Sequence, residues 1–196
     1  MFVATVMALR GKAVMALGVL VQFDALLRVS ELCGVVASAF AFSGDVRLGA
    51  VWSGCGINLR KTKTGPKFAE VKNPALVAVL RRHVSSLPGD ARVFPFSPAQ
   101  LLREMAGICE RYGLPHYTTH SLRHGMATRL FLQGVSVEDI RVRGRWKSSK
   151  SMDTYLQANR AIQLSLIIPP VVPEVFRLIE HYLEGLLSAA LPNAAQ

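Results

Sequence analysis

Apolar residues recur along most of the chain at the spacing of helices, and one stretch changes to the spacing of strands. Residues 4–27 are almost continuously apolar and predict one long buried helix, or two helices joined at Gly11 or Gly18. Between residues 40 and 72 the period shortens and turn residues intervene, which predicts a small antiparallel sheet of three strands. The apolar strand positions are Val46, Leu48, Val51, Ile57, Leu59, Phe68 and Val71.

Capping residues mark where helices begin and end after the sheet. Residues 73–87 and 97–112 are predicted to be helices, because each range starts with a capping residue followed directly by proline. Thr119 is expected to cap a central helix, and Gly134 stands where a glycine commonly ends one. A further short helix is expected from Ser136 to about Arg143.

Three prolines near the end of the chain divide it into two parts. Pro169, Pro170 and Pro173 form a stiff break. We therefore expect a folded domain over residues 1–165 and a separate segment over residues 166–196, whose final helix is amphipathic. The pattern leaves two roles open for this helix: assembly with a neighbouring protomer, or packing on its own domain. Its apolar stripe consists of Val175, Leu178, Ile179, Tyr182, Leu183, Leu186 and Leu187.

The composition narrows the possible partners. Apolar residues make up 51% of the 196, enough for a core, and 23 basic against 13 acidic side chains give a net charge of +10. Such a charge indicates a polyanionic partner, with nucleic acid ahead of an anionic membrane. The three cysteines lie far apart and acidic residues do not cluster, so we expect no metal and no cofactor. Neither apolar run near the N-terminus reaches the length of a membrane span.

Four short motifs stand in order along the chain and carry the candidate chemistry. His120 and Arg123 are three residues apart, so they share one face of the central helix, where an imidazole and a guanidinium suit a phosphate. Each motif alone is weak evidence. The four are Leu-Arg-Val-Ser-Glu-Leu around Arg28, the Lys-Thr-Gly turn at Lys63, His-Ser-Leu-Arg-His from His120 to His124, and Gly-Arg-Trp-Lys-Ser around Trp146, which Tyr155 follows after nine residues.

Together, in this order and at these spacings, the motifs resemble the catalytic domain of the tyrosine recombinases, the phage integrase family, over about residues 5–160. The resemblance implies an α+β, mostly α fold, in which a helical bundle carries a small three-stranded antiparallel sheet. The wording Gly-Arg-Trp-Lys-Ser is most similar to recombinases of eukaryotic mobile elements of the DIRS and Crypton type.

The resemblance also implies a set of site residues. Glu31 takes the acidic supporting position beside Arg28, although an ordinary salt bridge between the two is the plainer alternative. Lys61 is a rival of Lys63, because both alternate in the same strand. Trp146 stands where most members have histidine, and its indole suits a phosphate contact, packing against the tyrosine, or a plain core role. The implied catalytic residues are Arg28, Lys63, His120, Arg123, Trp146 and Tyr155.

The implied reaction is metal-independent DNA strand transfer. Tyr155 would attack a phosphodiester, form a 3′-phosphotyrosyl link and release a 5′-hydroxyl. Arg28 and Arg123 would hold the charge of the transition state. Lys63 would be the general acid for the leaving oxygen, and His120 the general base or a phosphate donor.

The resemblance thus implies a site-specific recombinase or integrase that cleaves and rejoins DNA. Its expected partners are double-stranded DNA and further copies of the chain, as a tetramer on DNA, without a membrane. We expect it in the nucleus of a eukaryote and otherwise in the cytoplasm. The residues expected to contact the DNA backbone are Arg141, Arg143, Arg145, Lys147 and Lys150.

Two other functions fit parts of the sequence. One is a DNA-binding module with the same fold that has lost cleavage. It is favoured because the family usually has a separate helical domain ahead of the catalytic one, whereas the resemblance here starts at residue 5. The other is a type IB topoisomerase-like enzyme, which shares the chemistry, but the order His-x-x-Arg argues against it.

Overall fold

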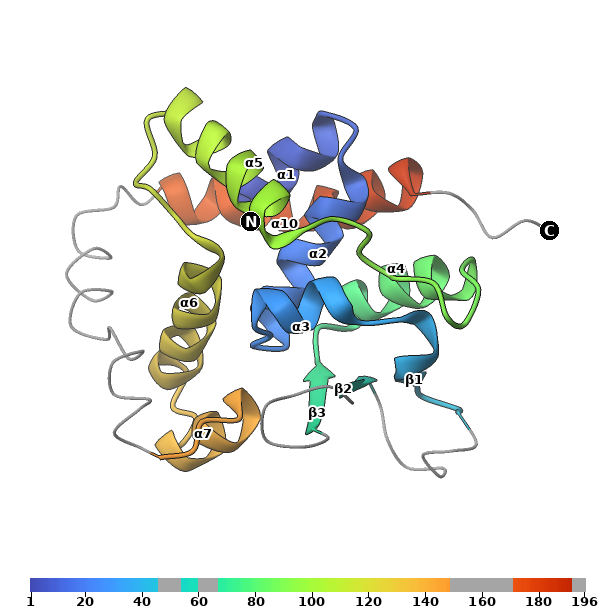
Figure 1. Cartoon of the computed structure of the whole chain (residues 1–196). Coiled ribbons are helices and arrows are strands. Elements are labelled where there is room, and N and C mark those ends of the chain that lie inside the picture. The colour runs from blue at the N-terminus through green and yellow to red at the C-terminus, as the bar shows by residue number, and fades with distance from the viewer. Residues whose placement is uncertain (46–53, 60–66, 149–170, 192–196) are drawn as a thin grey trace.

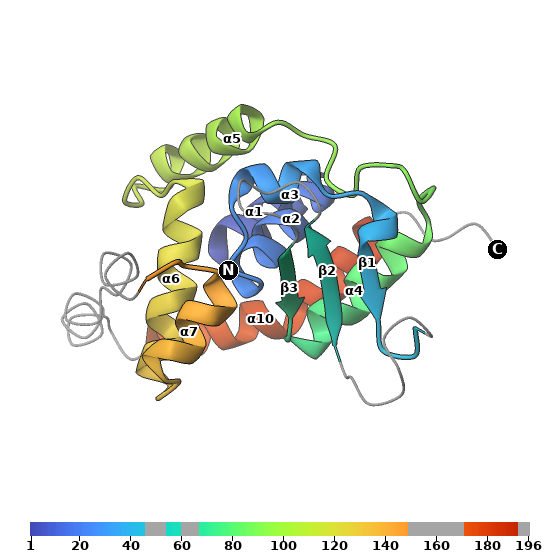
Figure 2. The ribbon, with the colours of Figure 1, turned by 60° about the horizontal axis from the view of Figure 1, so that its bottom comes forward.

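The computed structural model describes residues 1–45, 54–59, 67–148 and 171–191 and has the expected architecture. A small antiparallel sheet lies at one end of the molecule, and helices make up most of the rest of the described chain (Figures 1 and 2). The mostly helical α+β fold class is therefore confirmed. In chain order the elements are α1 (Phe2–Leu9), α2 (Ala13–Asp24), α3 (Val29–Gly34), η1 (Ala37–Ala39), β1 (Phe40–Phe42), β2 (Cys55–Leu59), β3 (Lys67–Val71), α4 (Pro74–Ser85), α5 (Pro98–Arg111), α6 (Thr119–Leu132), α7 (Val137–Gly144) and α10 (Val171–Ala190).

The apolar run at the N-terminus forms two helices rather than one. Gly11 has a φ of +73°, a left-handed conformation that glycine adopts without steric cost, and it separates α1 from α2. Arg10 donates to Glu104 of α5 over 3.2 Å, and Lys12 pairs with the same carboxylate. The turn is therefore tied to α5 by two exposed ion pairs, and the alternative junction at Gly18 lies inside α2.

The sheet has the order β1-β2-β3, with both pairs antiparallel. Phe40 lies opposite Ile57 in the first pair, and Ile57 lies opposite Ala69 in the second. All three side chains are buried, so the sheet contributes one face to the core. Of the expected strand positions, Val46, Leu48 and Val51 lie outside the described residues, as does the lysine-rich hairpin tip at residues 60–66.

Side-chain caps fix most of the helix starts that the sequence predicts. Asn73 accepts a hydrogen bond from Leu76 N over 3.0 Å at the start of α4, and Ser97 caps α5 in the same way. The central helix differs by one residue from the prediction. Thr118, whose backbone is extended, accepts from Ser121 N over 3.3 Å and is the cap of α6, while Thr119 is already helical.

The buried apolar residues form two clusters of unequal size. The main core joins α1, α2, α4, α5 and the sheet. A smaller cluster lies where α6 and α7 meet the end of α2, and consists of Leu26, Met126, Ala127, Leu130, Ile140 and Trp146. Every candidate site residue that the structure describes lies in this smaller cluster or beside it.

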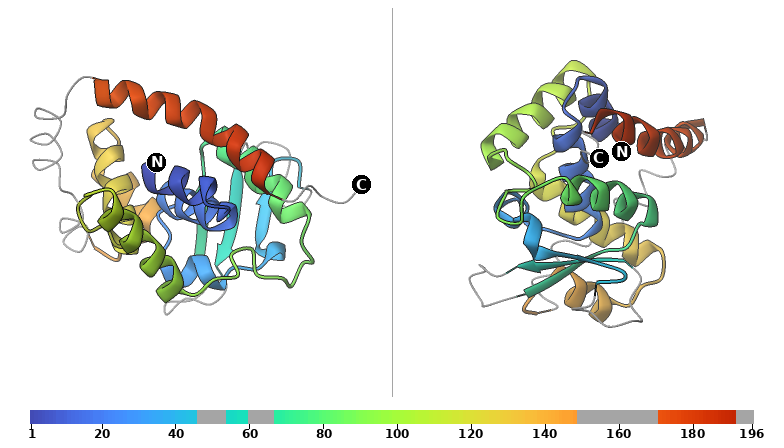
Figure 3. Two further views of the ribbon diagram at one scale, coloured as in Figure 1. Left: turned by 90° about the horizontal axis from the view of Figure 1, so that it is seen from above. Right: turned by 90° about the vertical axis from the view of Figure 1, so that its right-hand side faces the viewer.

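Helix α10 lies along one side of the molecule and contacts α1, α2 and α4 (Figure 3). Leu183, Leu187 and Leu191 are almost fully buried and belong to the main core. Packing on its own domain is therefore observed, as one of the two expected roles. Leu178 and Tyr182 point away from this contact and are 57% and 68% exposed. Among the described residues, no helix combines the length and the apolar character needed to cross a membrane.

Candidate functional site

The short connection between α2 and α3 is the base of the candidate site. Leu26 is fully buried and has a φ of +52°, a left-handed conformation that costs a residue other than glycine about 1–2 kcal/mol. Such strain persists only where surrounding contacts hold it, and it gathers at functional sites. The side-chain amide of Gln22 donates to Leu27 O over 3.4 Å and to Thr119 O over 3.0 Å. The connection is thus fastened to the start of α6.

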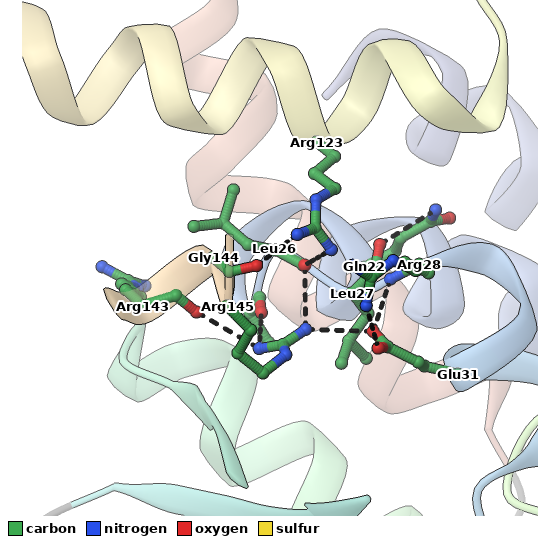
Figure 4. A network of polar contacts seen from close by, with 10 residues as sticks. Gln22, Leu26, Leu27, Arg28, Glu31, Arg123, Arg143, Gly144 and Arg145 are labelled. Atoms are coloured by element: carbon green, nitrogen blue, oxygen red, sulfur yellow. Dashed lines mark hydrogen bonds and ion pairs between the residues drawn. The ribbon is translucent and has the colours of Figure 1, made fainter. Parts of the chain in front are cut away.

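Arg123 of α6 reaches into this connection and is only 1% exposed. Its Nη1 donates to Leu26 O over 2.8 Å, and its Nη2 donates to Gly144 O. The guanidinium also lies over the ring of Trp146, 4.5 Å from the ring centroid. Arg123 therefore joins three segments that are far apart in the sequence, and its charge is held in the interior (Figure 4).

Trp146 follows α7 and is 6% exposed, packed in the smaller cluster. Its ring lies directly against Gly144, so that any Cβ at position 144 would overlap the ring. Core packing, one of the three roles considered for Trp146, is observed, together with the cation–π contact to Arg123. Packing against Tyr155 lies outside the described residues. The Trp146 ring thus packs where a side chain at position 144 would lie, so this contact needs the glycine of the Gly-Arg-Trp motif.

Arg28 begins α3 and keeps its side chain 47% exposed. Its Nη1 donates to Glu31 Oε1 over 2.8 Å, and its backbone N–H donates to Glu31 Oε2 over 2.8 Å. The expected pairing with Glu31 is therefore present, and it orients the arginine while leaving it accessible. Of the three described arginines Arg28, Arg123 and Arg145, Arg28 is the one that an external anion can reach directly.

Arg145 contradicts the expectation that it contacts DNA. It is 9% exposed, has a φ of +58°, and its Nη2 donates to Leu26 O and to Glu31 Oε2, each over 3.0 Å. Its Nη1 donates to the carbonyl oxygens of Arg143 over 3.2 Å and Ala25 over 3.4 Å. The guanidinium is directed inward because the left-handed turn after α7 points this side chain at the α2–α3 connection, a turn that sequence patterns do not predict.

Glu31 thus accepts hydrogen bonds from two arginines, and its own side chain is 6% exposed. Burial opposes ionisation of this carboxyl, but the charge of Arg145 and the hydrogen bonds and charge of Arg28 outweigh it and lower its pKa below the ordinary value of 4.5. Glu31 is therefore an anion at neutral pH.

His120 lies at the first turn of α6, close enough to the arginines to feel their charges. Partial burial, and then the charges of Arg123 and Arg28, lower its pKa below the ordinary value of 6.5. Its ring contacts that of His124 edge to face, with 5.0 Å between the centroids. The imidazole of His120 is therefore neutral at pH 7, as a proton acceptor requires.

Two more of the expected DNA-contacting arginines have partners within the chain. Arg141 forms an ion pair with Glu138, its neighbour three residues earlier, and Arg143 donates to Asp24 O over 2.8 Å. Lys147 is exposed.

Four of the six predicted site residues, Arg28, His120, Arg123 and Trp146, come together around the α2–α3 connection. The other two, Lys63 and Tyr155, lie outside the described residues, as do Lys61 and Lys150. Within the described part of the chain, no group of histidine, cysteine and acidic side chains is arranged to hold a metal ion.

Sequence and structure comparisons agree with this fold. Residues 5–161 match the model of the phage integrase family. The chain belongs to the phage integrase family, the tyrosine recombinases. No curated protein shows significant sequence similarity to the chain.

Several solved structures share the fold at low sequence identity. The XerA recombinase superposes with a TM-score of 0.60 at 19% identity, over 85% of this chain and 61% of that one. The XerH site-specific recombinase bound to its difH substrate superposes with a TM-score of 0.58 at 15% identity, over 80% of this chain and 47% of that one. The Tn1549 transposon integrase in complex with circular intermediate DNA superposes with a TM-score of 0.54 at 16% identity, over 77% of this chain and 59% of that one. The chain thus spans less than two thirds of each of these proteins.

Proposed function

We propose that this chain is a site-specific DNA recombinase or integrase that cleaves and rejoins DNA through a 3′-phosphotyrosyl intermediate. The observation that carries the proposal is the convergence of Arg28, His120 and Arg123 at one connection. These residues come from segments about ninety positions apart, and they are the residue types that a phosphoryl transfer without metal requires. The +10 net charge supports a DNA partner, and the XerH and Tn1549 neighbours are complexes with DNA.

The proposed reaction is a transesterification. The phenolic oxygen of Tyr155 forms a bond to phosphorus while the bond to the 5′-oxygen breaks, and Lys63 supplies the proton that this oxygen takes up. Neutral His120 accepts the phenolic proton, which its lowered pKa supports. Arg28, the exposed arginine, contacts a non-bridging oxygen of the phosphate.

Arg123 has a different part in this scheme. At 1% exposure its guanidinium holds Leu26 O, and through the connection it supports the position of Arg28. Because Arg123 is 1% exposed, its direct contact with a phosphate requires local movement of the groups around it. A fixed donor to the developing charge is worth about 3–4 kcal/mol, so this movement would add a large catalytic contribution.

The decisive experiment is covalent trapping on a nicked suicide duplex that prevents rejoining. The parent protein is expected to form an adduct that survives denaturing electrophoresis, and Tyr155→Phe is expected to form none. Tyr112→Phe is the matched control, because Tyr112 is 50% exposed at the end of α5 and its replacement is expected to leave the adduct unchanged. An adduct that persists in Tyr155→Phe would remove Tyr155 from the nucleophile role.

The second candidate is a DNA-binding module of the same fold without cleavage. The burial of Arg123, whose donors point to Leu26 O and Gly144 O, favours it. This candidate predicts DNA binding that weakens steeply with salt and no adduct on any nicked substrate. Binding and trapping measured on one preparation therefore separate the two functions.

We also propose that the chain assembles with further copies of itself, as a tetramer on DNA, in the compartment that holds the DNA: the nucleus of a eukaryote or otherwise the cytoplasm. The exposed side chains of Leu178 and Tyr182 on α10 support a contact between protomers. Replacing both by serine should lower the mass of the DNA complex in light scattering and leave the monomer folded. An unchanged mass would exclude this side of α10 from the assembly.

A further inference from the structure

Glu31 lies between two arginines of very different exposure. Arg28 has a side chain that is 47% exposed, whereas that of Arg145 is 5% exposed. We propose that Arg145 is a positioning residue for Arg28: it holds one side of the Glu31 carboxylate so that Arg28 stays oriented toward a DNA phosphate. This inference rests on the proposed contact between Arg28 and phosphate, and extends the site to a residue more than a hundred positions away in the sequence.

The two oxygens of Glu31 are divided between their partners. Oε1 accepts from Arg28 Nη1 over 2.8 Å. Oε2 accepts from the backbone N–H of Arg28 over 2.8 Å and from Arg145 Nη2 over 3.0 Å. Because Oε2 is occupied from two directions, Glu31 offers only one oxygen to the Arg28 side chain. The side chain is thus held by one Nη group, and its planar fork has further donors for an anion.

Arg145 is well suited to hold the carboxylate still. Its guanidinium also donates to the carbonyl oxygens of Leu26, Ala25 and Arg143, over 3.0–3.4 Å. Leu26 O accepts from Arg145 and Arg123 together, so the left-handed conformation of Leu26 aims one carbonyl at both guanidinium groups (Figure 4). Arg145 is therefore held by backbone carbonyl groups of the α2–α3 connection, which leads directly into Arg28.

Loss of Arg145 would change what Arg28 does. Glu31 is a buried anion, and burial of an ion without a partner is strongly unfavourable. With Arg145 removed, Arg28 is the remaining partner of Glu31 in this network. Both carboxylate oxygens would then engage the Arg28 fork, and the guanidinium would be drawn away from the phosphate. Removal of the Glu31 charge as well should release Arg28 again.

The test measures phosphate contacts rather than cleavage, so that it does not depend on catalysis. All variants are made in the Tyr155→Phe background, and their affinity for a short mixed-sequence duplex is measured as salt is varied. A lost phosphate contact lowers the slope of log K against log salt by about 0.9. Arg28→Met and Arg145→Met are each expected to lose about this amount. The combined variant should lose no more than Arg28→Met, because both act on the same contact.

Charge removal and rescue complete the design. Glu31→Gln with Arg145→Met should restore the parent slope, and this double variant decides the question even where Arg145→Met alone fails to fold. Arg10→Met removes an arginine that is also paired with a glutamate, but far from the site, and should keep the parent slope.

Four results would overturn the inference. Arg145→Met could keep the parent slope while melting earlier, or its loss could add to that of Arg28→Met. The double variant could stay at the lowered slope, or Arg10→Met could lose as much as Arg145→Met. In each case the contact of Arg28 with phosphate still stands. A parent slope in Arg28→Met would overturn that contact and this inference together, so the two failures are distinguishable.

Discussion

The main core and the α2–α3 connection are both buried, but they are built from different side chains. The main core is built from apolar side chains and includes Leu183 and Leu187 of α10 and Leu191 directly after it. The connection places two guanidinium groups, Arg123 and Arg145, at 1% and 9% exposure beside a small apolar cluster. Apolar packing tolerates exchanges of similar volume, whereas a buried charge needs its partners. The main core therefore provides stability, whereas the connection gives up some stability to hold the side chains of the site in place.

Truncating Trp146 tests the connection most severely. Trp146→Ala removes a ring that is 6% exposed and packs on Arg123, and should cost about 3–5 kcal/mol in the free energy of unfolding measured by urea titration. Trp146→Phe keeps an aromatic ring there and should cost less. A loss within about 0.5 kcal/mol for Trp146→Ala, as at surface positions, would contradict the packing.

Truncating a core leucine of α10 should affect stability and leave the site unchanged. Leu187→Ala removes a side chain that is 2% exposed and should cost about 2–5 kcal/mol in urea titration. The salt dependence of its duplex binding should equal that of the parent protein, because Leu187 belongs to the main core, where α10 packs on α1, α2 and α4. A lower slope of log K against log salt in Leu187→Ala would show that the main core and the α2–α3 connection are not independent.

Adding a methyl group at Gly144 should show whether close packing or helix propensity dominates the effect on stability. Gly144→Ala would overlap the Trp146 ring and should destabilise the protein by about 1–3 kcal/mol, seen as a lower melting temperature. Gly107→Ala is the matched control within α5, because no atom lies within 4 Å of the added Cβ. It should stabilise the helix by about 0.5–1 kcal/mol. Equal effects at the two positions would refute the contact.

The pH dependence of stability should change in one direction when Glu31 loses its charge. Its pKa is lower in the folded protein than the ordinary 4.5, so its contribution to stability is present above 4.5 and is lost as pH falls through the folded value. Glu31→Gln lacks this contribution, so its melting temperature should fall less than that of the parent below pH 4.5. Parallel curves for the two proteins would show that Glu31 is not held as an anion.

Local sequence patterns predicted most of the fold because their causes are local. The capping residues Asn73 and Ser97 satisfy backbone donors a few positions away, and the glycine at position 134 adopts the left-handed conformation expected after a helix. The cap of α6 was displaced by one residue because Thr118 and Thr119 both carry a suitable hydroxyl, and only the backbone conformation selects between them.

The contacts of the site also divide into local ones, which the sequence predicts, and long-range ones, which it does not. The pairing of Arg28 with Glu31 was expected because the residues are three positions apart. The sequence does not predict that Arg145 points inward, because its partners Leu26 and Glu31 lie more than a hundred positions away. The burial of Arg123 likewise depends on Gly144 and Trp146, which lie more than twenty positions further along the chain.

The sequence by itself determined the order of the helices and the sheet, the family, and which side chains carry the candidate chemistry. These properties follow from periodicity, caps and motifs, which act over a few residues. Only the tertiary structure decided which arginine faces outward and which two are held inside. That choice depends on which backbone carbonyls and which carboxylate come within hydrogen-bonding distance, and distant segments reach these positions only when the chain has folded.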